Sequence, residues 1–168
     1  MFDQDALETL ASAVGQALLA RGERLATAES CTGGWLAQAI TAIPGSSDWF
    51  DRGFVTYANA AKVEMLGVDP ATLDRHGAVS EACAREMLAG TLKLSQADWA
   101  VSITGIAGPG GGCFDKPVGS VWFAFGGPAA VADATLQRFE GDRRAVRAQA
   151  VAFALETLRG KLATPMRA

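Results

Sequence analysis

A short apolar segment in the middle of the chain limits the possible folds more than any other feature. Residues 97–105, ADWAVSITG, are apolar and partly β-branched, which is typical of a strand buried inside a sheet. A segment with helical spacing, residues 81–94, precedes it, and a long glycine-rich loop, residues 106–117, follows it. A buried strand set among helical segments predicts a protein of the α/β class.

The rest of the chain alternates between helical and strand patterns. Helical spacing of apolar residues occurs in residues 5–20, 33–43, 60–66 and 143–158, and residues 69–77 predict a short helix or turn. Asn59 and Ser80 are the predicted helix caps, and Gly141-Asp142 is predicted to open the last helix.

Strand patterns occupy residues 24–30, 49–58, 118–126 and 130–139. The last two, joined by residues 127–129, predict an antiparallel pair. This order of elements predicts one domain over residues 1–168, a three-layer α/β/α fold with a mixed, mostly parallel sheet.

Composition excludes several classes of protein. The net charge of -3 and a pI near 5.1 argue against non-specific nucleic-acid binding, which needs an excess of Lys and Arg. The three cysteines, Cys31, Cys83 and Cys113, are far apart and form no CxxC pair. Their spacing argues against a disulfide framework or a structural zinc site and fits a reducing compartment.

Neither targeting nor metal binding is indicated by the sequence. The N-terminus, MFDQDALETL, is acidic and polar, which predicts no signal peptide. The longest apolar run, VWFAFGGPAAVA, is broken by Gly-Gly-Pro and is too short to span a bilayer. His76 is the only histidine, so a multi-histidine metal site is impossible. We therefore expect a cytoplasmic protein with no metal and no cofactor.

The segment TAESCTGGW, residues 27–35, places Ser30 between a predicted strand and a predicted helix. Its position is that of a nucleophile elbow, although Ala28 and Thr32 stand where that motif has glycines. The backbone N–H groups at the helix start could hold an oxyanion or a phosphate; they belong to Cys31, Thr32, Gly33 and Gly34. In the alternative interpretation, Ser30 or Thr32 only caps the helix. Cys31 is a rival nucleophile, because a helix N-terminus stabilises a thiolate.

A serine nucleophile needs a base, and His76 lies in a polar turn that predicts a solvated side chain. Lys62 falls in the first turn of its predicted helix, where the helix dipole disfavours a cation. Burial would lower the pKa of Lys62 further and leave an amine able to accept the serine proton. Tyr57 lies five residues earlier and could donate a hydrogen bond in the same cleft. The alternative for Lys62 is an exposed helix lysine.

The glycine loop GIAGPGGG, residues 105–112, lacks the Lys and Ser/Thr of a P-loop and is not followed by the helix of a dinucleotide fingerprint. Its N–H groups could cradle an anion, or the loop is simply flexible. Thr104 precedes it at the strand end, where open α/β sheets place ligand contacts. Arg143 and Arg144 open the last helix, where either a phosphate or Asp142 could offset their charge.

Five motifs occur in order along the chain: TAESCTGG, VTYANAAKVEMLGV, GAVSE, ITGIAGPGGG…KPVG and GDR. Together they resemble the CinA C-terminal domain family, the nicotinamide-nucleotide amidohydrolases, from about residue 5 to 160. The resemblance implies hydrolysis of nicotinamide mononucleotide (NMN) to nicotinate mononucleotide and ammonia, a pyridine-nucleotide salvage step without a metal. It also implies a three-layer α/β/α fold that is commonly dimeric. The expected partners are thus a mononucleotide substrate and a second copy of the chain, with no nucleic acid and no membrane.

The resemblance also implies roles for single residues. Ser30 matches the family nucleophile, and Lys62 and Tyr57 match its activating partners. Thr104 and Gly105 match the strand end that lines the pocket, and Arg143 matches the arginine of GDR, which implies a phosphate contact. The sequence departs from the family at Ala60, where glutamate is frequent, and at residues 113–115, CFD, which replace a Thr-Pro-acidic turn.

The mechanism that follows is acyl transfer. Lys62 deprotonates Ser30, and N–H groups near residues 31–34 or at Gly105 stabilise the oxyanion. Two alternatives remain open at this stage. One is a non-catalytic nucleotide-binding module with the same pocket, and the other is an amidohydrolase that acts on another carboxamide.

Overall fold

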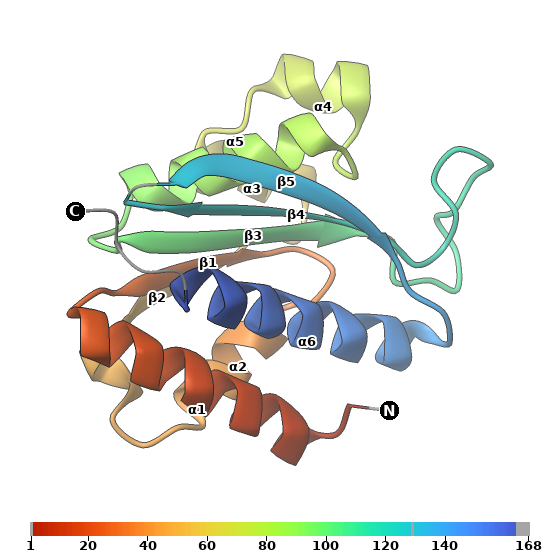
Figure 1. The fold of residues 1–168 in the computed structure, drawn as a ribbon. Helices are drawn as coiled ribbons and strands as arrows, with labels where there is room; N and C mark the ends of the chain where they lie inside the picture. Colours follow the sequence, from red (N-terminus) through yellow and green to blue (C-terminus); the bar gives the residue numbers. More distant parts are fainter. Residues whose placement is uncertain (1, 129, 164–168) are drawn as a thin grey trace.

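The computed structural model describes residues 2–128 and 130–163. Its centre is a five-stranded sheet in the order β2-β1-β3-β4-β5 (Figure 1). The strands are β1 (Leu25–Glu29), β2 (Phe50–Val55), β3 (Trp99–Gly105), β4 (Ser120–Gly127) and β5 (Ala130–Arg138). β1 pairs in parallel with β2 and β3, while β4 is antiparallel to β3 and β5. Only β4 therefore runs against the rest, which confirms the mixed, mostly parallel sheet.

Helices cover both faces of this sheet and complete the predicted three layers (Figure 1). One face carries α1 (Gln4–Arg21), α2 (Trp35–Thr41) and α6 (Arg143–Leu162). The other carries α3 (Asn59–Leu66), α4 (Pro70–His76) and α5 (Glu81–Lys93). A short 3₁₀ helix, η1 (Ser46–Asp48), leads into β2.

The two faces are packed differently. Beneath α1 and α6 the core is large and includes the rings of Phe123, Phe139 and Phe153, which contact one another edge-on or tilted. Under α5 the buried contacts with β3 and β4 are made largely by alanines, among them Ala84, Ala100 and Ala124. Because these side chains are small, α5 packs close to the sheet. The close packing of α5 keeps the layer of α3, α4 and α5 next to the strand ends.

Several predicted boundaries are confirmed and two are wrong. Ser80 caps α5 with its side chain, as predicted, and the Asp142 side chain caps α6. Asn59 does not cap α3, because Ala58 occupies that position without a side-chain bond. α2 begins at Trp35 and not at Gly33: both preceding glycines have positive φ and form a turn. The predicted hairpin turn includes residue 129, which lies outside the described residues.

The parallel strands all end at one edge of the sheet. Glu29 at the end of β1 is in register with Val55 of β2 and with Ile103 of β3. Directly beyond the strands, Ser30 N–H donates to the Ile103 carbonyl at 2.9 Å, and Thr56 N–H donates to the Glu29 carbonyl at 2.9 Å. The residues that follow these three strands are therefore held side by side, and the candidate site lies there. In the part of the chain described, no helix is long and apolar enough to cross a membrane.

Candidate active site

Ser30 and Lys62 meet at this edge of the sheet. Ser30 follows β1 directly, and Lys62 reaches it from the second turn of α3. The Lys62 Nζ lies 3.0 Å from the Ser30 Oγ. It also donates to the backbone carbonyls of Thr56 at 2.8 Å and Tyr57 at 3.3 Å. The predicted pair of serine and lysine is thus within hydrogen-bond distance, which is the geometry that an activated nucleophile needs.

The environment of Lys62 is unusual for a lysine. Only 1% of the residue is exposed, so the interpretation as an exposed helix lysine is wrong. Among the described residues, no carboxylate forms an ion pair with it. Burial lowers the pKa of Lys62 below its ordinary value of 10.5 and outweighs the opposing effect of the Cys83 and Cys31 thiols. The shift is in the direction of the neutral amine that a general base requires.

The start of α2 is already occupied by a side chain of the protein. Glu29, buried to 1% exposure, accepts hydrogen bonds from the N–H groups of Leu36 at 3.0 Å and Ala37 at 2.9 Å. Its carboxylate thus offsets the positive end of the helix dipole. The N–H of Gly33 is used as well, since it donates to the Ser30 carbonyl at 3.0 Å. The N–H groups of Gly33, Leu36 and Ala37 are therefore already used and are not free to bind an oxyanion.

Three N–H groups after the nucleophile remain available. Those of Cys31, Thr32 and Gly34 donate to no oxygen of the described residues. The thiol of Cys31 is buried, and burial raises its pKa to about 11, with the charge of Glu29 adding to the effect. A thiol with this pKa stays protonated near neutral pH, so Cys31 is a weaker candidate nucleophile than Ser30.

A cavity of about 280 Å³ opens in front of Ser30. Its lining comes from several segments of the chain: the ends of β1, β2 and β3, residues 78–79, the glycine loop and the start of α6. Thr104 and Gly105 lie on its wall as predicted, and the Thr104 hydroxyl donates to the Ala78 carbonyl at 2.8 Å. Gly105 has no room for a side chain, because a Cβ would lie 2.7 Å from Val121 Cγ2 and 2.8 Å from the Ser120 carbonyl. This glycine therefore lets the end of β3 lie close to β4 at the wall of the cavity.

Tyr57 and Arg143 face each other across the mouth of the cavity. The Arg143 guanidinium donates to the Tyr57 hydroxyl at 2.6 Å and to the Gly108 carbonyl at 2.8 Å. The Tyr57 side chain is 58% exposed, so its hydroxyl belongs to the rim, while its carbonyl contacts Lys62. Arg143 thus ties the rim to the glycine loop.

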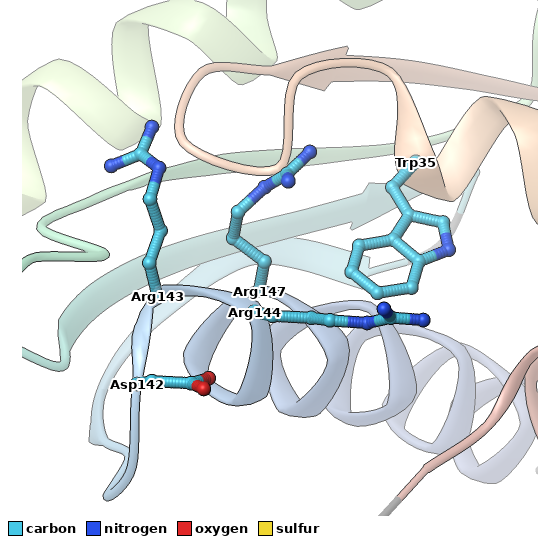
Figure 2. A pocket seen from close by; sticks show the side chains of 5 residues that line it. All are labelled: Trp35, Asp142, Arg143, Arg144 and Arg147. Atoms are coloured by element: carbon cyan, nitrogen blue, oxygen red, sulfur yellow. The ribbon is translucent and has the colours of Figure 1, made fainter.

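Behind Arg143 an open hollow of about 620 Å³ surrounds the first turns of α6 (Figure 2). Three arginines, Arg143, Arg144 and Arg147, and the indole of Trp35 line it together with Asp142. Arg147 reaches up to the loop before α2, whereas Arg143 extends away from it (Figure 2). Of the three, Arg143 alone also lines the cavity at Ser30.

The predicted site residues divide into two groups. Ser30, Cys31, Tyr57, Lys62, Thr104, Gly105 and Arg143 line one cavity. Thr32 is fully buried, and neither it nor Gly33 nor Gly34 is among the described residues that line it. Sequence reasoning missed the roles of Glu29 and Arg147. The glutamate in ESCTGG was visible, but nothing in its spacing indicated that it turns toward the helix that follows.

Comparisons with known proteins identify the family of the chain. A profile of the CinA C-terminal domain matches residues 7–162. The chain is 57% identical over 158 residues to the nicotinamide-nucleotide amidohydrolase PncC of Escherichia coli (strain K12), covering 94% of this chain and 95% of that protein. It is 47% identical over 154 residues to the protein of the same name from Pseudomonas putida, with 92% and 96% covered. A crystal structure of a CinA superfamily protein from Klebsiella pneumoniae matches with a TM-score of 0.89 at 48% identity, covering 94% of this chain and 98% of that one.

Proposed function

This chain belongs to the CinA C-terminal domain family, and from that premise we propose that it is a nicotinamide-nucleotide amidohydrolase. The reaction converts NMN and water to nicotinate mononucleotide and ammonia, a step of pyridine-nucleotide salvage. Relatives that carry this activity in their names are 57% and 47% identical to the chain over nearly its full length. Within the chain, the contact between Ser30 and Lys62 is the observation that carries the proposal.

Lys62 Nζ donates to three acceptors, which match the three donors of the ammonium form; a neutral amine, the state that the mechanism needs, uses the same three partners as follows. A neutral lysine has two N–H donors and one lone pair, one donor fewer than the ammonium form. Two backbone carbonyls, those of Thr56 and Tyr57, accept from Nζ, and they use both donors. The lone pair is then directed to the third neighbour, the Ser30 hydroxyl at 3.0 Å. In this state Ser30 donates its proton to Lys62, which is the first step of nucleophilic activation.

The reaction then proceeds in two halves. The Ser30 Oγ attacks the carboxamide carbon, and its proton passes to Lys62. The C–N bond breaks as Lys62 returns that proton to the departing nitrogen, which leaves ammonia and an ester on Ser30. Water attacks the ester, Lys62 accepts the proton of the water, and the proton returns to Ser30 as nicotinate mononucleotide leaves. The N–H of Cys31, which lines the cavity, is the donor nearest in sequence for the oxyanion.

The other end of the substrate is assigned to the rim of the cavity. Besides Lys62, Arg143 is the only basic residue among the described residues of the cavity lining, and a guanidinium suits a phosphate. The glycine loop adds backbone N–H groups on the same side. Binding energy gained at the phosphate positions the carboxamide at Ser30.

Three further properties belong to the same proposal. The whole chain, residues 1–168, forms one domain of this family, and it assembles as a homodimer, as the resemblance implies. Its three cysteines are free thiols, Cys113 on the surface and Cys31 and Cys83 buried, which supports a reducing location such as the cytoplasm. Size-exclusion chromatography with light scattering tests the dimer.

Ammonia release from NMN tests the activity and the two residues together. We expect wild-type turnover, and we expect Ser30→Ala and Lys62→Ala to lose about 10²- to 10⁴-fold in kcat. Lys93→Ala is the matched control, because Lys93 is exposed at the far end of α5. Nicotinamide riboside and nicotinamide, offered in the same assay, measure how much the phosphate contributes.

The outcomes separate the alternatives. Full activity of Ser30→Ala rules out the serine mechanism. Tight NMN binding without turnover by the wild type identifies a binding module instead of an enzyme. Faster turnover of a carboxamide without a phosphate would assign the enzyme to another substrate.

A further inference from the structure

We propose that Arg147 is a positioning residue for the turn that follows the nucleophile. The guanidinium donates through Nε to the Cys31 carbonyl at 3.1 Å and through Nη2 to the Thr32 carbonyl at 2.8 Å. Arg147 is not among the described residues that line the cavity at Ser30. It therefore acts on the reaction through the backbone of the turn, and this role rests on the proposed function.

The two hydrogen bonds fix the directions of two successive peptide groups. In a trans peptide the N–H points opposite to the C=O. Because the Thr32 carbonyl faces Arg147, the Gly33 N–H points away from it, and there it donates to the Ser30 carbonyl at 3.0 Å. Arg147 is thus connected to the main chain of Ser30 by one intervening peptide group.

The second peptide group joins Cys31, which lines the cavity, to Thr32. Because the Cys31 carbonyl is held by Arg147, the Thr32 N–H is directed away from the guanidinium. That N–H has no oxygen acceptor among the described residues. A cation bonded to the carbonyl of a peptide also polarises the peptide and strengthens its N–H as a donor. Arg147 therefore both aims and strengthens a donor group beside the nucleophile.

Arg147 is itself held in place. Its Cζ lies 5.3 Å from the centroid of the Trp35 ring, a distance typical of a cation–π contact. The Trp35 indole N–H donates to Gln4 Oε1 at 3.2 Å, so α1 anchors the ring. Figure 2 shows the guanidinium extended from α6 to the loop before α2. Arg147 of α6 therefore holds the carbonyls of the turn, while Glu29 holds the N–H groups at the start of α2 that follows it.

Kinetics of three variants test the role. Arg147→Met keeps the packing of the stem on Trp35 but removes both donors, and we expect kcat for NMN to fall about 10- to 100-fold while KM changes less than about 3-fold. Arg147→Lys keeps the charge without the two-pronged geometry, so we expect an intermediate loss. Arg159→Met is the matched control, since Arg159 is an exposed arginine in the last turn of the same helix.

Two readouts do not depend on turnover. Amide hydrogen exchange of residues 30–35 is expected to quicken at least about 10-fold in Arg147→Met and to stay unchanged in Arg159→Met. Labelling of Ser30 by a fluorophosphonate probe is expected to slow in proportion to kcat. If the wild type releases no ammonia from NMN, the proposed function fails, yet the exchange experiment still decides whether Arg147 holds the turn.

The opposite results overturn the proposal. A raised KM with unchanged kcat would make Arg147 a substrate contact, and unchanged exchange at residues 30–35 would show that the turn holds its shape without it. If Arg147→Met does not fold, Arg147→Lys decides the question by the same two criteria.

Discussion

The two walls of the active-site cavity are built in opposite ways. On the nucleophile wall, buried side chains hold the backbone: Glu29 binds the start of α2, Arg147 binds the turn, and Lys62 binds the carbonyls after β2. The opposite wall is the loop of residues 106–119, which projects beyond the edge of the sheet (Figure 1). Its tip carries Phe114 at 99% exposure.

The difference shows how the site divides its tasks. A reaction step is sensitive to displacements of about 1 Å in the reacting groups, so Ser30 and Lys62 stand where packing and hydrogen bonds allow little movement. The glycine loop is held mainly by backbone bonds at its base, such as Ile106 N–H to the Ser120 carbonyl at 2.9 Å and Gly119 N–H to the Ile106 carbonyl at 2.8 Å. It encloses the substrate without supplying a reacting side chain. The following changes test this division.

The largest effect is expected from a change on the nucleophile wall. Lys62→Met removes the base and should lower kcat for NMN about 10²- to 10⁴-fold. In the wild type, kcat should rise with pH and level off above the lowered pKa of Lys62, because only the neutral amine accepts the serine proton. Ammonia release across a pH series measures both. A wild-type kcat that falls as pH rises through this range would contradict the role of the neutral amine.

The same variant shows how burial of Lys62 links stability to pH. The pKa of Lys62 is lowered in the folded protein and returns to about 10.5 on unfolding, so the unfolded chain binds more protons between these two values. The free energy of unfolding of the wild type, relative to Lys62→Met, should therefore rise with pH across that window and be lowest below it. Denaturant titrations at several pH values measure this difference. A difference that does not vary with pH would mean that the pKa is not lowered.

Substituting one glycine in each wall tests how tightly each wall is packed. Gly105→Ala forces a Cβ to within 2.7 Å of Val121 Cγ2 and 2.8 Å of the Ser120 carbonyl, and should lower the free energy of unfolding by about 1–3 kcal/mol. Gly110→Ala in the loop meets no atom within 4 Å and should change it by less than about 0.5 kcal/mol. Urea denaturation compares the two variants. Equal losses would mean that the loop is as tightly packed as the strand end.

A smaller effect is expected where the walls meet at the rim. Tyr57→Phe removes the hydroxyl that accepts from Arg143 at 2.6 Å but leaves the carbonyl that Lys62 binds. We expect KM for NMN to rise about 3- to 10-fold, in line with the loss of one charge-assisted hydrogen bond, and kcat to stay within about 2-fold. Steady-state kinetics measure both constants. A fall in kcat as large as that of Lys62→Met would make the phenol part of the chemistry.

The smallest effect is expected at the loop tip. Cys113 is exposed, whereas Cys31 and Cys83 are buried and burial raises the pKa of each thiol to about 11. Iodoacetamide near pH 7.5 should therefore modify Cys113 first, with activity staying within about 2-fold of the untreated enzyme. Mass spectrometry of the labelled protein identifies the site. Rapid loss of activity on modification of Cys113 alone would show that the tip takes part in turnover.

The sequence predicted the order of the elements and the location of the site. Alternating helical and strand patterns determine which segments follow one another, and parallel strands bring Ser30, Lys62 and Thr104 to one edge. Local patterns do not encode where a buried side chain turns. Glu29 binds Leu36 and Ala37 only because the turn at Gly33 and Gly34 brings them back to it. Arg147 lies more than one hundred residues from its carbonyl partners, so its contact depends on how α6 packs.

The carboxylate of Glu29 at the start of α2 makes the two ends of the cavity electrostatically different. Burial, with the charge of Glu29 adding to it, raises the pKa of the Cys31 thiol, so a permanently charged group such as a phosphate is disfavoured at the buried Ser30 end of the cavity. Arg143 attracts an anion at the other end. A mononucleotide carries its neutral carboxamide and its charged phosphate at opposite ends. Such a molecule fits this electrostatic gradient in one orientation only, with the amide leading toward the nucleophile and the phosphate trailing at the mouth.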